Sequence, residues 1–177
     1  MSEIAIWFER KFSFEFPAEL YPNLCARLRG TPARLEEVTR GVSLSELTLQ
    51  TEGKWSIQEN AGHMFDLEEL WAARIEDYRK RAERLTAAEL TNRKTHEARH
   101  NERAFGEILI AFRRARLAWV ARLDNLKPHE FAQTALHPRL EQTLRLVDHL
   151  YFVAEHDDHH LARIWELRRQ ARAFAAE

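Results

Sequence analysis

The chain has 177 residues, 45% hydrophobic and 31% charged, a composition typical of one globular domain with its own core. Lysine and arginine (27) nearly balance aspartate and glutamate (28), so we expect neither a nucleic acid nor an acidic membrane as partner. The single cysteine cannot form an internal disulfide, and the N-terminal residues contain no uninterrupted apolar run. We therefore expect a cytoplasmic protein.

Apolar residues recur at helical spacing in the first half of the chain, and no run there or later is typical of a β-hairpin. The first helical region runs from about Pro17 to Arg40. A kink or restart is predicted inside it at Thr31–Pro32, because threonine followed by proline is typical of a helix start. A second helix begins at "SIQE", where Ser56 and Glu59 match a capping box, and runs from Ile57 to about Leu85.

The second half predicts two further helices. "TAAELTNRKTHEARHN" is polar and predicts a long connection with one short helical turn. A third helix follows Asn101, and a fourth runs from Thr143, as its cap, to about Ala171. Four long amphipathic helices predict an all-α fold, an up-down-type four-helix bundle with long connections. We expect one domain over residues 1–177, with residues 1–16 as an N-terminal extension packed on the bundle.

Four of the tryptophans have predicted positions. Trp71, Trp119 and Trp165 fall on apolar helix stripes and are expected to be buried. Trp7 lies before the bundle, where it can cover one end or contact a partner subunit.

The unusual stretch of the fourth helix is "HDDHH", residues 156–160. His156 and His160 are four apart, so they project from the same helix face, which is otherwise mostly apolar. Two imidazoles at this spacing can bind one divalent ion. His159 points about 100° away from His160. We assign it to the surface or to a position just behind the ligands.

A third ligand is predicted on the second helix. His63 follows the capped start of that helix by less than two turns and has apolar neighbours. In a bundle it can meet the histidine pair of the fourth helix across the core. Three histidines leave positions on the ion open, which is typical of a catalytic site. Gly62, beside His63, predicts a close approach by another helix or a ligand.

The remaining histidines have simpler interpretations. His96 and His100 repeat the spacing of a metal-binding pair, but they lie in a polar segment and are expected to be exposed. His129 and His137 stand near prolines and are interpreted as loop residues. His149 lies two turns before His156 on the same face, where it can line the cavity.

Two motifs in this order resemble those of the DinB/YfiT-like superfamily of four-helix bundles. They are "WSIQENAGH", Trp55–His63, and "HDDHHLARI", His156–Ile164, and the similarity covers about Pro17 to about Arg169. The resemblance implies a divalent transition metal, zinc or nickel or iron, bound by the three histidines named above. It also implies a homodimer, and a small-molecule thiol such as bacillithiol or mycothiol together with an electrophilic substrate.

Three functions remain open. The first is transfer of a metal-activated thiol, and the second is hydrolysis by metal-bound water with Glu59, Asp66 or Asp157 as base. The third is a non-catalytic binding or stress-response module. Glu59 is the weakest base if it closes the capping box. Arg163 stands where the family pattern has glutamine, and its charge can favour an anionic thiol or substrate.

Overall fold

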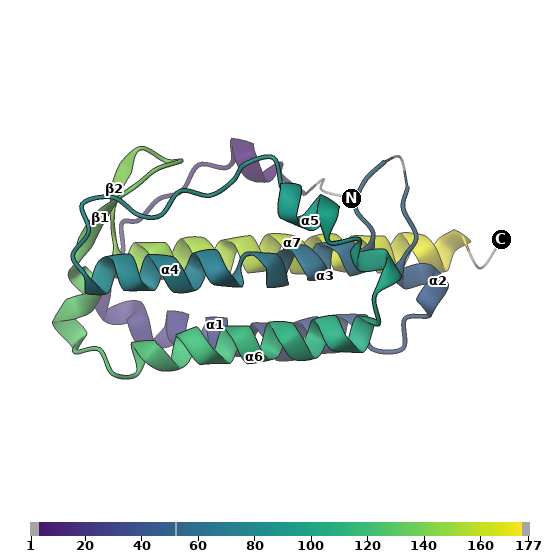
Figure 1. Cartoon of the computed structure of the whole chain (residues 1–177), viewed down its shortest axis with the longest axis horizontal. Helices are drawn as coiled ribbons and strands as arrows, with labels where there is room; N and C mark the ends of the chain where they lie inside the picture. The colour runs from purple at the N-terminus through teal and green to yellow at the C-terminus, as the bar shows by residue number, and fades with distance from the viewer. Residues whose placement is uncertain (1–3, 52, 175–177) are drawn as a thin grey trace.

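The structure, a computed structural model, describes residues 4–51 and 53–174, and helices dominate this part of the chain (Figure 1). The long helices are α1 (Tyr21–Thr39), α3 (Ile57–Asp66), α4 (Glu68–Arg79), α6 (Phe105–Leu123) and α7 (Leu146–Phe174). Short helices are α2 (Leu44–Leu47) and α5 (Arg93–Glu97), and single 3-10 turns cover Trp7–Glu9, Ala18–Leu20, His100–Glu102 and Pro128–Ala132. Within the described ranges, no helix is both long and apolar enough to cross a membrane.

The predicted four-helix bundle is confirmed, with α3 and α4 together forming one of its four columns. The column α3–α4 contacts α6 and α7, and α1 contacts the other sides of α6 and α7. Because residues 80–104 return along the outside of the bundle, α4 and α6 point in the same direction (Figure 1). The order of directions is therefore up, down, down, up, with one long crossover.

The predicted restart of the first helix is wrong, because α1 runs through Thr31 and Pro32. A proline inside a helix removes one hydrogen bond to the carbonyl four residues earlier, here that of Leu28. The Leu28 carbonyl instead accepts a hydrogen bond from Arg116 Nη1 of α6 at 3.3 Å. A side chain from another helix therefore replaces the lost bond, which the local sequence does not reveal.

The second predicted helix is correct at its start and wrong at its end. Ser56 accepts from the Glu59 amide at 3.1 Å, and the Glu59 carboxylate accepts from the Ser56 amide at 2.8 Å, as the capping box predicts. Leu67 separates α3 from α4, which ends at Arg79. Leu85 is still buried, but in extended backbone whose amide donates to the Leu136 carbonyl at 3.0 Å.

A β-hairpin precedes α7, contrary to the expectation that the chain has none. Strands β1 (Thr134–His137) and β2 (Gln142–Arg145) pair in antiparallel register, with Thr134 opposite Arg145. Thr143 therefore lies in β2 instead of capping the helix, and α7 starts at Leu146. Asp148 accepts from the Arg145 amide at 2.8 Å and so satisfies a free donor at the helix start.

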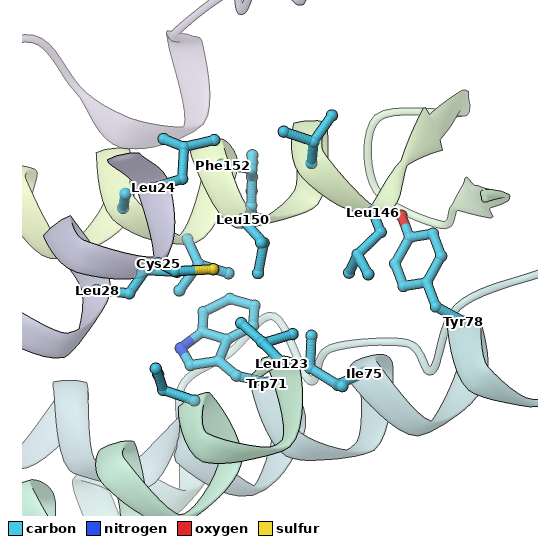
Figure 2. Packing of buried hydrophobic residues seen from close by; sticks show 14 of the residues in the cluster. Leu24, Cys25, Leu28, Trp71, Ile75, Tyr78, Leu123, Leu146, Leu150 and Phe152 are labelled. Atoms are coloured by element: carbon cyan, nitrogen blue, oxygen red, sulfur yellow. The ribbon is translucent and has the colours of Figure 1, made fainter. Parts of the chain in front are cut away.

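The apolar core consists of two clusters with a charged layer between them. The cluster nearer the hairpin joins α1, α4, α6 and α7, and Figure 2 shows Leu24, Cys25 and Leu28 of α1 in this cluster together with Trp71 of α4. The second cluster lies nearer α2 and includes Leu35, Ile57, Met64, Phe112 and Ile164. The burial of Trp71 and Trp119 is confirmed, whereas Trp165 is 52% exposed because it lies beside the buried stripe of α7.

Between these clusters lies a buried ion-pair layer. Arg116 donates to Glu68 at 2.7 Å and to Asp157 at 2.5 Å, and all three side chains are almost completely buried. Thr31 donates to Asp157 at 2.9 Å. Because these four residues come from four different helices, the layer fixes the positions of α1, α4, α6 and α7 along the bundle axis relative to one another.

Candidate metal centre

The structure brings the three predicted ligands together. His63 of α3 and His156 and His160 of α7 each place one ring nitrogen within 4.8 Å of those of the other two. Their residue exposures are only 5%, 4% and 6%. The four-residue spacing on α7 and the packing of α3 against α7 produce this cluster.

A hydrogen bond from α3 fixes the tautomer of His160. Asn60 donates through its amide nitrogen to the carbonyls of Trp55 and Ser56, which leaves its Oδ1 facing His160. That oxygen lies 2.9 Å from His160 Nδ1, so the imidazole donates through Nδ1. Its Nε2 therefore carries the lone pair that a metal ligand needs.

The other two histidines also suit a metal. His63 Nδ1 lies 3.0 Å from the hydroxyl of Thr95 on α5, a contact of the kind that orients metal-binding imidazoles. His156 Nδ1 is buried and has no hydrogen-bond partner among the described residues. A buried polar atom without a partner is costly in an ordinary core. The donor set therefore fits a divalent transition metal, the class that imidazole binds.

Burial keeps all three imidazoles neutral. Desolvation, opposed by the charge of Asp66 and reinforced by that of His100, lowers the pKa of His63 from 6.5 to about 4. Desolvation also lowers the pKa of His156 and His160 well below 6.5, and each is lowered further by its histidine neighbours. At neutral pH the lone pairs are free to bind an ion.

The cluster forms part of the wall of a pocket with a volume of ≈ 910 Å³. Trp55 covers one side, its ring centroid 4.7 Å from that of His63. Trp7, from the segment before the bundle, lies 5.0 Å from the His156 ring and is itself buried. A pocket of this size, lined by aromatic side chains and by several convergent polar and charged groups, is typical of a small-molecule site.

Of the residues predicted to support the site, His159 and Arg163 line this pocket. His159 is half-buried there, and its ring centroid lies 5.7 Å from that of Trp7. Arg163 also lines the pocket, but its guanidinium is paired with Glu166 at 2.5 Å.

Three supporting residues lie elsewhere. Glu59 closes the capping box, Asp157 belongs to the ion-pair layer, and neither lines the pocket. His149 is completely buried behind the wall, beside Trp71 and His137. All three lie on helices that contribute to the site, but Asp157 faces α1 and α6, His149 faces α4 and the hairpin, and Glu59 turns back to the start of its own helix.

Two histidines interpreted as exposed or loop residues are buried. His100 is 1% exposed and its Nε2 lies 2.8 Å from Asp66 Oδ2. Its ring lies against Gly62 of α3, which explains the predicted close approach. His137 is 1% exposed at the end of β1, whereas His96 is exposed as expected and His129 is exposed within the 3-10 turn Pro128–Ala132.

Sequence reasoning missed Asn60, Thr95 and two arginines, Arg74 and Arg139, that line the pocket. Asn60 precedes His63 by about one helical turn, so helical spacing could have placed it on the same face of α3 as His63. The other three come from segments whose position depends on the tertiary structure.

The comparisons agree with this architecture. The solved structure of YfiT from Bacillus subtilis matches with a TM-score of 0.78 and 20% identity, covering 92% of this chain and 94% of that chain. That protein is described as "a probable metal-dependent hydrolase with an unusual four-helix bundle topology". No curated protein matches. The model of the DinB superfamily matches residues 27–164, which include the whole histidine cluster. The chain therefore belongs to the DinB superfamily.

Proposed function

We propose that this protein is a metal-dependent transferase that activates a low-molecular-weight thiol and joins it to an electrophilic substrate. The observation that carries the proposal is the convergence of three neutral imidazoles on the wall of a ≈ 910 Å³ pocket. An ion held by three protein ligands retains positions for a small molecule. The pocket has room for a thiol and a second reactant beside it.

A divalent metal in this cluster would lower the pKa of a thiol, so that the thiolate forms near neutral pH. The protein itself contributes orientation and a dry environment. Asn60 and Thr95 hold two of the imidazoles, while Trp7 and Trp55 shield them from water. The sulfur then forms a bond to the electrophilic carbon, the leaving group departs with its electron pair, and the thiol proton passes to solvent.

Hydrolysis is the second candidate, and the description of YfiT favours it. Activation of water commonly uses a nearby general base. The carboxylates predicted for this task are engaged elsewhere: Glu59 with Ser56, Asp66 with His100 and Asp157 with Arg116. A thiol ionises far more readily than water and has less need of such a base. This difference supports the transferase.

Metal content tests the site itself. We expect untagged protein, titrated with zinc, nickel or iron(II), to bind about one equivalent, as one three-imidazole cluster would. The double variant His156→Ala, His160→Ala should lose this binding, whereas His129→Ala, which changes an exposed histidine, should retain it. Wild-type protein that binds none of the three metals would contradict both enzymatic functions.

Turnover separates the two reactions. Metal-loaded protein is given bacillithiol or mycothiol with 1-chloro-2,4-dinitrobenzene, and separately p-nitrophenyl acetate without thiol. A transferase releases chloride only when the thiol is present and loses this activity in the double variant. Thiol-independent ester cleavage that is lost in the same variant would identify a hydrolase instead.

A further inference from the structure

A buried arginine without a counter-ion lies in the same pocket, toward the hairpin. Arg74 of α4 is 1% exposed and lines the pocket. Its Nε donates to the Thr86 carbonyl at 2.9 Å, and its Nη1 lies 3.0 Å from His137 Nε2. No carboxylate in residues 4–51 and 53–174 forms an ion pair with it. Fully buried charges are normally paired, yet no described group of opposite charge is bonded to this guanidinium.

A second arginine strengthens the positive charge there. Arg139, from the hairpin turn, donates to the Trp7 carbonyl at 3.2 Å and packs over the rings of Trp7 and Phe152. It also forms no ion pair with a described carboxylate. The charge of Asp77 attracts that of Arg74, but the Asp77 carboxylate accepts hydrogen bonds from the Thr86 amide and hydroxyl. It forms no ion pair with the Arg74 guanidinium.

Around His137, hydrogen-bond donors also outnumber acceptors. His137 Nε2 faces Arg74 Nη1, and His137 Nδ1 faces the Leu140 amide at 3.2 Å. A neutral imidazole has only one lone pair, so it cannot accept both bonds. Desolvation, followed by the charges of Arg74 and Arg139, lowers the pKa of His137 to about 3 and keeps it neutral. At least one N–H group here therefore has no acceptor.

The arginines lie close to the histidine cluster. The Arg74 guanidinium is 5.5 Å from the ring of Trp71, which is 5.8 Å from the ring of His156. Likewise, the ring of Trp7 lies 5.4 Å from the Arg139 guanidinium and 5.0 Å from the ring of His156. One indole ring thus separates each guanidinium from the histidines, and a single ligand several bonds long can reach both.

We propose that Arg74 and Arg139 form an oxyanion subsite that binds the carboxylate of an organic acid while its reactive end lies at the histidine cluster. The role at the reactive end rests on the proposed function; the anion subsite does not. The planar guanidinium matches a carboxylate, and the aromatic walls match an apolar chain behind it. A singly charged group also costs less to desolvate here than a phosphate dianion.

Binding of pentanoate to metal-free protein tests the subsite directly, with the uncharged pentanamide as matched ligand. Isothermal titration should show at least tenfold weaker pentanoate binding in Arg74→Gln and in Arg139→Gln than in wild type. Arg114→Gln, which removes an exposed arginine outside the pocket, should bind as wild type does. Pentanamide should bind weakly to all four proteins. Equal pentanoate affinity in the four, or no preference for pentanoate over pentanamide, overturns the proposal.

Folding of the variants is checked by thermal unfolding. Arg74→Gln removes an unpaired buried charge and should fold without pentanoate, and pentanoate should raise the unfolding temperature of wild type more than that of the variant. If Arg74→Gln does not fold, Arg139→Gln alone decides the test, because Arg139 is only partly buried.

Zinc-loaded protein identifies the reactant that carries the carboxylate. If the thiol carries it, 5-mercaptopentanoate binds wild type at least tenfold more tightly than pentanoate, and Arg74→Gln or Arg139→Gln reduces the difference. If the electrophile carries it, pentanoate and butanethiol bind together without competing. Arginine-dependent pentanoate binding in protein that binds no metal would refute only the metal centre. Metal and thiol binding without any effect of the two arginines would refute only the subsite.

Discussion

At the scale of single residues, close contacts determine which side chains the site tolerates. Gly62 precedes His63 and lies under the ring of His100, and an added Cβ would stand 2.2 Å from His100 Cγ. His100 cannot easily move away, since it is buried and bound to Asp66. The glycine is therefore needed for close packing behind His63 rather than for backbone flexibility.

Gly62→Ala should consequently destabilise the protein by about 1 to 3 kcal/mol, although alanine is the better helix former. Gly30→Ala is the matched control, because Gly30 lies within α1 and an added Cβ there meets nothing within 4 Å. That variant should be stabilised, by up to about 1 kcal/mol. Urea unfolding measures both changes. Two equally stable variants would show that the His100 ring can move away from the added Cβ with no loss in the free energy of unfolding.

At the scale of helices, the ion-pair layer holds the bundle together in a defined register. Arg116 of α6 bonds Glu68 of α4 and Asp157 of α7, and also the Leu28 carbonyl that Pro32 leaves without its helical partner. Asp157 directly follows His156 in the chain. The layer therefore also sets the position of the face of α7 that carries His156 and His160.

Loss of Arg116 should be far more costly than loss of a surface arginine. Arg116→Met leaves Glu68 and Asp157 buried without their cation, and we expect a loss of about 3 to 5 kcal/mol in the free energy of unfolding. Arg122→Met removes an exposed pair with Glu76 and should cost less than about 1 kcal/mol. Similar losses in the two variants, measured by urea unfolding, would mean that the buried ion pairs contribute no more to stability than an exposed one.

At the scale of the whole molecule, buried histidines make folding sensitive to acid. Burial lowers the pKa of His63, His137, His149, His156 and His160. Above about pH 6.5 they are neutral in both the folded and the unfolded chain. As the pH falls below that value, the unfolded chain binds protons and the folded protein does not. Stability is therefore lost on acidification.

His137 isolates one such contribution away from the proposed ligands. Its pKa in the folded protein is about 3, so its contribution falls between pH 6.5 and pH 3. Between pH 7 and pH 5 this single group should remove about 2 kcal/mol from the free energy of unfolding. His137→Gln should lose that much less than metal-free wild type over the same interval. An identical pH dependence in urea unfolding would rule out this role for His137.

The histidine cluster and most helices followed from the sequence, because they depend on local spacing. Residues four apart share a helix face, and the capping box of Ser56 and Glu59 acts within one turn. His63, His156 and His160 were therefore identifiable, and so were the positions of the four helical columns. The order of two motifs added the family, which the match over residues 27–164 establishes.

Only the tertiary structure decided which polar groups serve this site. The bond between His160 and Asn60 joins residues 100 positions apart, and Arg116 reaches across 88 positions to the Leu28 carbonyl that Pro32 leaves free. Arg74 and Arg139 reach the same pocket from α4 and the hairpin turn. Such contacts arise from packing between distant segments, whose geometry no local pattern specifies. The same reason explains why the carboxylate of Asp157 turned out to hold the bundle together instead of serving the pocket.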